Sequence, residues 1–209
     1  MNKLILLRHG QSQWNLENRF TGLKDVPLTI KGIEEAKKAG LVMKKNNISI
    51  DMVFSSVLSR ANNTAEIALS EMNIKKLYKD GKLIMKKDKS LNERDYGDLV
   101  GLNKEETSKK FGKKQVKIWR RSYDVSPPGG ESLEKVVSRV KPYLEKNIKP
   151  NIIDGKNVLI VAHGNSLRAT MIFIGLYKPQ QISNIEIPTG IPFVVNYEDG
   201  EVINSKFLS

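Results

Sequence analysis

The sequence predicts a single α/β domain with three layers, in which helices cover both faces of a mostly parallel sheet. Short apolar runs, such as residues 3–7 and 158–162, alternate with longer segments whose apolar residues recur at helical spacing. Strands that are apolar along their whole length are typical of parallel sheets buried on both faces. No linker, repeat or low-complexity tract divides the chain, so residues 1–209 are expected to form one domain.

The individual elements follow from local signals. Thr29 is suited to cap one helix, and Asn103 with Glu106 forms a capping-box pattern before another. Pro142 lies inside a predicted helix and is expected to kink or shorten it. The predicted strands are 3–7, 52–54, 83–85 and 158–162, with an edge pair at 193–197 and 202–207. The predicted helices are 30–46, 59–69, 104–111, 132–146 and 166–177.

The composition narrows the function classes. Lys and Arg total 35 and Asp and Glu total 23, a net charge of +12, which suggests an anionic partner. The lysines are spread along the chain as pairs, which is typical of a solvated surface, and no nucleic-acid recognition motif is present. The absence of Cys excludes disulfides, a thiolate nucleophile and Cys-ligated metals. The apolar run at 4–7 is too short for a signal peptide or membrane span, so we expect a cytoplasmic protein without a membrane partner.

The only two histidines of the chain occupy the same local setting. The sequences are LILLRHGQS at 4–12 and VLIVAHGNS at 158–166, each an apolar strand followed by His-Gly, an amide residue and Ser. Because ligands bind at the carboxyl ends of strands in open α/β sheets, His9 and His163 are expected to face one crevice. An isolated histidine would be interpreted as an ordinary polar strand end, but the matched pair favours a functional site. A metal site is the weaker alternative, since no third ligand stands at metal-like spacing.

Other residues suggest phosphate chemistry without ATP. Arginine is scarce, at eight residues, and its planar guanidinium binds phosphate or carboxylate through two hydrogen bonds. No P-loop pattern and no dinucleotide-binding glycine motif occurs. Covalent or acid–base catalysis by histidine remains, because a neutral imidazole is a good phosphoryl acceptor near pH 7.

Several sequence blocks carry a family resemblance. They are RHGQSQWN (8–15), NRFTG (18–22), LNER (91–94), YG (96–97), GLNK (101–104), WRR (119–121) and HGNSLR (163–168). In this order they resemble the histidine phosphatase superfamily, and within it the short phosphoglycerate mutases that depend on 2,3-bisphosphoglycerate. The resemblance spans nearly the whole chain. It implies a phosphoglycerate mutase-like fold, phosphoglycerates as small-molecule substrates, 2,3-bisphosphoglycerate as primer, and no metal. It leaves a homodimer or a higher homo-oligomer open.

The resemblance also implies a role for each matching residue. His9 would carry the phosphoryl group, Glu93 would be the general acid–base, and His163, Arg8 and Arg60 would hold the transferring phosphoryl. The following residues would bind the other phosphate or the carboxylate: Ser12, Asn15, Thr21, Gly22, Tyr96, Lys104, Arg120, Arg121, Gly164 and Asn165. Arg19 and Arg139 are left over and are interpreted as structural or surface residues.

Two rival functions and two departures from the family pattern stay open at this point. A phosphatase would share the chemistry but pass the phosphoryl group to water. A basic protein that is not an enzyme and binds nucleic acid or anionic membranes is supported only by the net charge. Asp95 stands where many relatives have His, beside the predicted acid–base. The segment 127–132 is shorter than in longer relatives, which leaves open how the pocket is covered.

Overall fold

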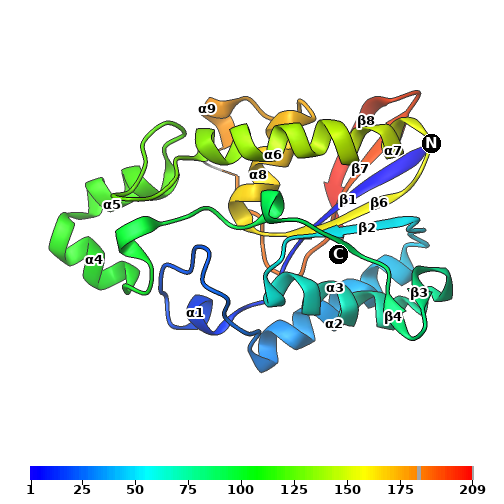
Figure 1. The fold of residues 1–209 in the computed structure, drawn as a ribbon, viewed down its shortest axis with the longest axis horizontal. Coiled ribbons are helices and arrows are strands. Elements are labelled where there is room, and N and C mark those ends of the chain that lie inside the picture. The colour runs from blue at the N-terminus through cyan, green and yellow to red at the C-terminus, as the bar shows by residue number, and fades with distance from the viewer. Residues whose placement is uncertain (183–184, 209) are drawn as a thin grey trace.

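The computed structural model describes residues 1–182 and 185–208, which are built around a six-stranded sheet (Figure 1). Along the sheet the strands are β5 (Lys86–Lys87), β2 (Met52–Ser55), β6 (Val158–Ala162), β1 (Asn2–Arg8), β7 (Phe193–Glu198) and β8 (Glu201–Phe207). The pairings of β5, β2, β6 and β1 are parallel, whereas β7 and β8 are added antiparallel at one edge. The mostly parallel sheet confirms the predicted fold class.

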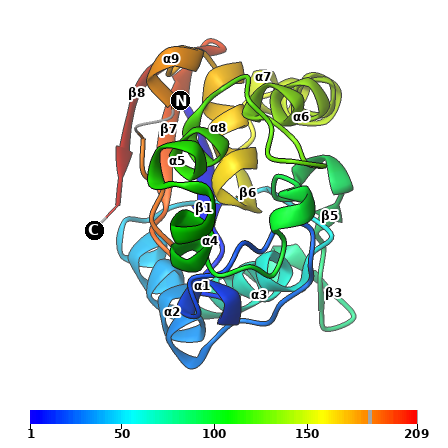
Figure 2. The ribbon, with the colours of Figure 1, turned by 90° about the vertical axis from the view of Figure 1, so that its left-hand side faces the viewer.

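Helices cover both faces of this sheet. In Figures 1 and 2, α2 and α3 lie on one side, and α6 with α8 lies on the other. The helices are α1 (Gln13–Leu16), α2 (Ile30–Lys45), α3 (Ser59–Met72), α4 (Lys104–Phe111), α5 (Lys113–Arg121), α6 (Leu133–Asn147), α7 (Lys149–Ile153), α8 (Gly164–Phe173) and α9 (Pro179–Ile182). Short 3-10 turns are η1 (Lys75–Leu77), η2 (Lys89–Leu91) and η3 (Gly97–Leu99).

The apolar runs of β1 and β6 serve both helical layers at once. Leu4 and Leu6 of β1 belong to the core beneath α6 and α8. Ile5 and Leu7, which alternate with them, belong to the core against α2 and α3. Because successive strand residues point to opposite faces, a strand covered on both sides has to be apolar throughout. This requirement explains the continuous runs seen in the sequence.

The predicted strand at 83–85 is wrong. Its first residue belongs to β4 (Lys82–Leu83), which forms a small hairpin with β3 (Tyr78–Lys79). Asp80 and Gly81 connect the two strands and both have positive φ, as tight two-residue hairpin turns require. The chain then joins the main sheet only at β5, after Ile84 and Met85. The Asp80–Gly81 turn therefore draws Leu83 into the hairpin, and the apolar run at 83–85 does not form a strand of the main sheet.

Pro142 does not shorten its helix. α6 continues to Asn147 with Pro142 inside it. A proline leaves the carbonyl four residues earlier, here that of Ser138, without its helical donor. Both Pro142 and Ser138 are exposed, so water can bond that carbonyl, and the helix is maintained by its buried face. The short helices α1 and α5 were not predicted, because α1 has four residues and α5 is dominated by Lys and Arg.

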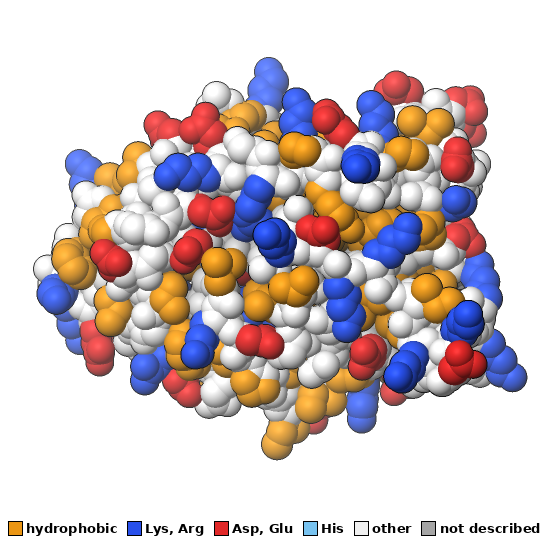
Figure 3. All heavy atoms as spheres, viewed as in Figure 1, with side chains coloured by type: hydrophobic (Ala, Val, Ile, Leu, Met, Phe, Trp, Pro, Cys, Tyr) orange, Lys and Arg blue, Asp and Glu red, His pale blue; other side chains and the backbone are white. Residues whose placement is uncertain are grey.

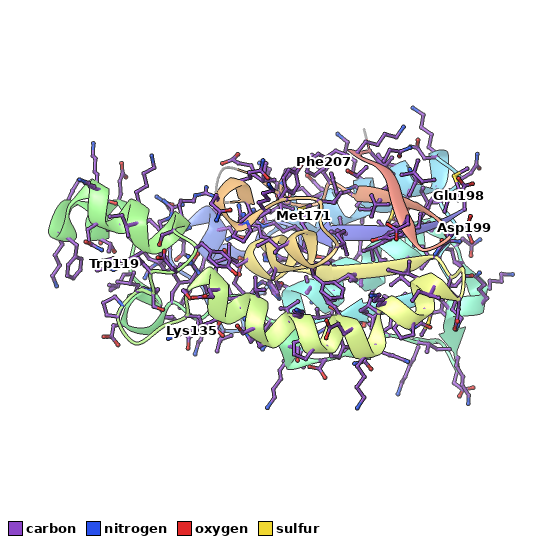
Figure 4. All side chains as sticks on the ribbon, turned by 90° about the horizontal axis from the view of Figure 1, so that it is seen from above. Trp119, Lys135, Met171, Glu198, Asp199 and Phe207 are labelled. Atoms are coloured by element: carbon purple, nitrogen blue, oxygen red, sulfur yellow. The ribbon has the colours of Figure 1, made fainter. Side chains whose placement is uncertain are left out.

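The carboxyl ends of the parallel strands meet at the end of the molecule where α1, α4 and α5 lie (Figure 1). Figure 4 shows the long axis from above, with Trp119 of α5 at one end and the Glu198–Asp199 turn between β7 and β8 at the other. Phe20, Leu99 and Val116 form a small separate core at the α5 end, with Tyr96 and Trp119 packed against it. This small core fixes the helices that close one side of the crevice.

The contact between α2 and α3 gives a stability prediction. A Cβ on Gly40 would collide with the carbonyl oxygen of Ala68 on α3. Gly40→Ala should therefore lower the free energy of unfolding by about 1–3 kcal/mol through overpacking. The loss is expected even though alanine stabilises an exposed position inside a helix by about 1 kcal/mol relative to glycine. Urea unfolding measures the change. Leu41→Ala on the exposed side of α2 is the control, with a change within about 0.5 kcal/mol; a stabilised Gly40→Ala variant would contradict the packing described.

Candidate active site

A cavity of about 160 Å³ opens at the carboxyl ends of β1 and β6. It is lined by Arg8, His9, Asn15, Arg19, Phe20, Thr21, Gly22, Arg60, Glu93, Tyr96, Lys104, Arg120, Arg121, Gly164, Asn165 and Arg168. Thus the structure brings together all but two of the site residues predicted from the sequence. Ser12 and His163 do not line the cavity. Both are fully buried, and the ring of His163 lies next to that of His9.

The register of the sheet explains why the two histidines meet. Arg8 of β1 is paired with Ala162 of β6 in parallel. The residue that follows each of these strands is a histidine, so His9 and His163 lie side by side where the chain leaves the sheet. Their ring centroids are 5.0 Å apart, with an angle of 60° between the ring planes. The repeated sequence pattern therefore has a geometric cause, because equal strand ends in register place equal residues next to each other.

His9 is held with one ring nitrogen free for chemistry. Its Nδ1 lies 2.7 Å from the carbonyl oxygen of Gly10. Since a carbonyl can only accept, Nδ1 carries the proton and Nε2 of the neutral ring has a lone pair. The Gly10 backbone is fixed in turn, as its N–H donates to Thr64 Oγ1 and a Cβ would collide with the Gly32 carbonyl. Close backbone approach thus explains why glycine follows this histidine.

Both imidazoles are neutral near pH 7. Burial lowers the pKa of His9 well below its usual range, and the neighbouring His163, Arg60 and Arg8 lower it further against the opposing bond to Gly10. Burial likewise lowers the pKa of His163, followed by the charges of Arg60 and Arg8. A neutral His9 is the nucleophilic form of the ring.

Arg8 and Arg60 are anchored by backbone carbonyls. Arg8 donates to Ile187 O at 2.8 Å, and Arg60 donates to Lys24 O at 2.8 Å and to Gly22 O at 3.0 Å. The Nε atom of each arginine is buried and has no hydrogen-bond partner within residues 1–182 and 185–208. Buried donors of this kind normally find a partner, so both are suited to an anion in the cavity.

Glu93 is present as a carboxylate. Its Oε1 accepts from the N–H of Arg94 at 2.7 Å and from the side-chain amide of Asn165 at 3.0 Å. Burial alone would raise its pKa, but these hydrogen bonds together with the charges of Arg8 and Arg60 produce a net lowered pKa. A half-buried carboxylate near the charges of Arg8 and Arg60, on the wall of the cavity, is suited to take a proton as a general base.

Side-chain hydrogen bonds that the sequence did not reveal hold residues 90–95, called here the Glu93 segment. Arg139 of α6 donates to the carbonyls of Ser90, Asn92 and Glu93 at 2.8–3.1 Å. It also pairs with Glu131 at 2.8 Å, and Glu131 accepts from the N–H of Asp95 at 2.9 Å. Arg139 is therefore structural, as interpreted, and it fixes the backbone that carries Glu93.

The other end of the cavity is cationic and lies on the α4–α5 side. Lys104 begins α4, and Arg120 and Arg121 end α5. Arg94 is fully buried and donates to Trp119 O and Arg120 O at 3.0 Å, so it ties the end of α5 to the Glu93 segment. Its guanidinium also lies 4.6 Å from the Tyr96 ring centroid. The last turn of α5 and the Glu93 segment are thereby held together.

Arg168 and Arg19 line the cavity but were not among the predicted site residues. Arg168 donates from Nε and Nη2 to Ile185 O, and burial with the charge of Arg121 lowers its pKa to about 10. Arg19 pairs with Glu17 at 2.8 Å at the cavity mouth. The signal for Arg168 was its place five residues after His163, at the end of the HGNSLR block. Seven cationic side chains thus line the cavity against one carboxylate, Glu93.

The two departures from the family pattern are structurally linked. Asp95 turns its carboxylate to the N–H of Gly97 at 2.9 Å, and it does not line the cavity. The short loop at 127–130 docks on this segment through the bonds from Asp98 N–H to Pro128 O and from Glu131 N–H to Asp95 O. A Cβ on Gly97 would collide with Pro128 O. The short loop therefore supports the Glu93 segment from outside.

Neither a metal cluster nor a membrane helix is found in the part of the chain that the structure describes. No group of three or more His, Asp or Glu side chains there is placed to hold a metal ion. Within the same ranges, no helix is long and apolar enough to cross a membrane. On the face shown in Figure 3, basic side chains are scattered among acidic and apolar ones. Seven cationic side chains, in contrast, gather at the cavity.

An open α/β sheet with two buried histidines, two arginines and a carboxylate at its carboxyl edge defines an enzyme that handles phosphorylated compounds. The chain belongs to the histidine phosphatase superfamily (branch 1), whose family model matches residues 4–206.

Relatives agree with this assignment, and solved structures share the fold. The chain is 47% identical over 203 residues to a 2,3-bisphosphoglycerate-dependent phosphoglycerate mutase of Nitrobacter hamburgensis, covering 97% of this chain and 95% of that protein. It is 46% identical over 208 residues to the protein of that name in Parvibaculum lavamentivorans, covering 99% of this chain and 96% of that protein. Its fold resembles that of a mycobacterial glucosyl-3-phosphoglycerate phosphatase complexed with VO3, with a TM-score of 0.80 and 23% sequence identity. The match covers 99% of this chain and 97% of that chain. It also resembles the alpha-ribazole phosphatase of Shigella flexneri (TM-score 0.78, 24% identity, 99% and 95% covered).

The lowered histidine pKa values predict that the ligand-free protein is less stable in mild acid. The folded state binds fewer protons at these rings than the unfolded chain, so their contribution is complete above about pH 6.5 and is lost as the pH falls below it. For each ring the loss approaches about 1.4 kcal/mol per pH unit. Urea unfolding between pH 7.5 and 5.5 measures this slope. His163→Gln should give a shallower slope than the native chain, and equal slopes would refute the neutral buried pair.

Proposed function

We propose that this protein is a 2,3-bisphosphoglycerate-dependent phosphoglycerate mutase, which interconverts 3-phosphoglycerate and 2-phosphoglycerate in glycolysis and gluconeogenesis. The observation that carries the proposal is the two-ended charge of the cavity. His9, Arg8, Arg60 and Glu93 form one end, and the cations of α4 and α5 form the other. A substrate with a phosphate and a second anionic group fits such a cavity. The name shared by the relatives at 46–47% identity supports the same function.

The residues present fit 2,3-bisphosphoglycerate. Nε of Arg8, Nε of Arg60 and Oγ1 of Thr21 are buried polar atoms without partners among the described residues, so they offer hydrogen bonds to phosphate oxygens. Gly164 has no Cβ and so leaves space between Arg168 and Glu93. A Cβ added there would lie 3.3 Å from Nη1 of Arg168 and 3.7 Å from Oε2 of Glu93. When bound, 2,3-bisphosphoglycerate supplies the phosphoryl group that His9 carries. Arg8, Arg60 and His163 would hold that group, and Lys104, Arg120 and Arg121 would hold the other anionic end.

The side chains divide the transfer among them. Nε2 of His9 would form the N–P bond while the P–O bond of the donor phosphate ester breaks, and the N–P bond would break in turn when a substrate hydroxyl oxygen attacks phosphorus. Glu93 takes the proton of that hydroxyl and returns it to the leaving oxygen in the reverse direction. The guanidinium groups of Arg8 and Arg60 bear the charge that develops on the transferring phosphoryl. Their backbone anchors keep them in place, so little reorganisation is needed during the reaction.

Ser12, Asn15, Tyr96 and Asn165 are proposed to assist in binding, and Ser12 would do so indirectly. Ser12 N–H donates to Asn15 Oδ1 at 3.2 Å, which orients an amide that lines the cavity. Asn165 Nδ2 bridges Glu93 and the Tyr96 hydroxyl, at 3.0 and 3.5 Å. These contacts orient the polar groups between the two ends of the cavity.

The first prediction from this function concerns turnover. Pure protein should isomerise 3-phosphoglycerate only when catalytic 2,3-bisphosphoglycerate is present, and a chelator should leave the rate unchanged. His9→Ala should abolish the activity, because it removes the nucleophile. A coupled assay for 2-phosphoglycerate measures the rate. Release of inorganic phosphate without isomerisation would instead assign the chain to the phosphatases of the superfamily.

A second prediction concerns the distal cations. Arg120→Gln should lower kcat/KM by about tenfold to a hundredfold, mostly through a higher KM, because it removes a charge-assisted hydrogen bond to the bound substrate. Lys117→Gln is the matched control, since Lys117 is an exposed cation on the same helix and does not line the cavity. Steady-state kinetics of both variants measure the effect. Equal losses in the two variants would mean that general surface charge, and not the distal end of the cavity, binds the substrate.

A further inference from the structure

The two buried histidines differ in the partner of the bonded ring nitrogen. Nδ1 of His9 meets the carbonyl oxygen of Gly10, which can only accept. Nε2 of His163 lies 2.7 Å from the hydroxyl oxygen of Ser56, which can either donate or accept. The position of the proton on His163 therefore depends on where the Ser56 hydroxyl proton points.

The hydrogen bonds around Ser56 decide this direction. Ser56 is fully buried, and its Oγ accepts from the N–H of Leu58 at 3.2 Å. Among the residues that the structure describes, Nε2 of His163 is the one acceptor bonded to this hydroxyl. If Nε2 carried a proton, two donors would point at Oγ and the hydroxyl proton would be left buried without an acceptor, which is unfavourable. With Ser56 as the donor, every polar group of this serine side chain is satisfied.

We infer that Ser56 is a positioning residue, whose hydroxyl donates to Nε2 of His163 and so fixes His163 as the tautomer protonated on Nδ1. That Nδ1 is buried and has no hydrogen-bond partner in residues 1–182 and 185–208. A buried donor without a protein acceptor, on a ring 5.0 Å from that of His9, is suited to an oxygen of a phosphoryl group carried by His9. This last step rests on the proposed function; the tautomer itself does not.

The inference gives the two similar histidine motifs opposite roles. His9 presents a lone pair at Nε2 because a carbonyl holds its Nδ1–H. His163 presents an N–H donor because a hydroxyl bonds its Nε2. A neutral His163 can therefore stabilise phosphoryl oxygens by hydrogen bonding without becoming an imidazolium, which burial beside Arg8 and Arg60 disfavours.

Nitrogen-15 NMR of the ligand-free protein tests the tautomer directly. The chain has only two histidines, so the spectrum contains two rings, and a His9→Asn variant assigns them. In the native protein at pH 7.5 both rings should be protonated on Nδ1 and bare on Nε2. Ser56→Ala should move proton occupancy of His163 toward Nε2 and leave His9 unchanged.

The chain offers a matched control. Ser55 is also fully buried, and its hydroxyl donates to Val161 O at the same end of the sheet. Ser55→Ala therefore removes a buried hydroxyl from the adjacent position without touching His163, and both histidine tautomers should stay as in the native protein. Ser56→Thr, which keeps the hydroxyl, should restore the native tautomer of His163.

A kinetic measurement connects the tautomer with phosphoryl transfer. Ser56→Ala should slow the phosphorylation of His9 by 2,3-bisphosphoglycerate by about tenfold to a hundredfold, the range for a lost hydrogen bond to a charged group. Ser55→Ala should not slow it comparably. A native His163 protonated on Nε2, or an unchanged tautomer in Ser56→Ala, would overturn the inference even if the protein is a mutase. A native Nδ1–H tautomer in a protein that never phosphorylates His9 would leave the inference standing and reject the proposed function.

Discussion

The site depends on burying positive charge around a space that an anion can fill. Arg8 and Arg60 are held by backbone carbonyls, which satisfy some of their N–H groups and leave Nε of each without a protein partner. A buried charge is unfavourable unless it is paired and hydrogen-bonded. Among the described residues, Glu93 is the one carboxylate that lines the cavity against seven cationic side chains, so an anionic ligand would offset part of this excess positive charge. The same positive field and the burial keep both histidines neutral.

The sheet sets the positions of the histidines relative to these charges. Parallel pairing of β1 with β6 places the two histidines at one level, and apolar cores on both faces of the sheet hold the two strands that carry them. The remaining groups come from loops tied to this frame. Arg139 fixes the Glu93 segment to α6, and Arg94 fixes the last turn of α5 to that segment. The Glu93 segment is thereby tied to α6 through the guanidinium of Arg139 and to the distal cations through that of Arg94.

Much of the fold followed from the sequence, because the buried strands are apolar throughout and the helix caps are explicit. The strand at 83–85 failed because the Asp80–Gly81 turn outweighs a short apolar run. The repeated His-Gly pattern and the family resemblance found most residues that line the cavity. Neither could find Ser56 or Arg139, since their roles lie in hydrogen bonds across 107 and 46 residues, respectively, that no local pattern encodes. Arg168 ends the HGNSLR block five residues after His163, but its place on the cavity wall depends on how α8 leaves the sheet.

His9, and not His163, is expected to carry the phosphoryl group. Rapid mixing with isotopically labelled 2,3-bisphosphoglycerate, followed by quenching and peptide mapping by mass spectrometry, tests this assignment most directly. An acid-labile phosphoryl group should appear on His9, should be absent in His9→Asn and should form more slowly in His163→Gln. A phosphoryl group on His163, or on a serine or threonine, would contradict it.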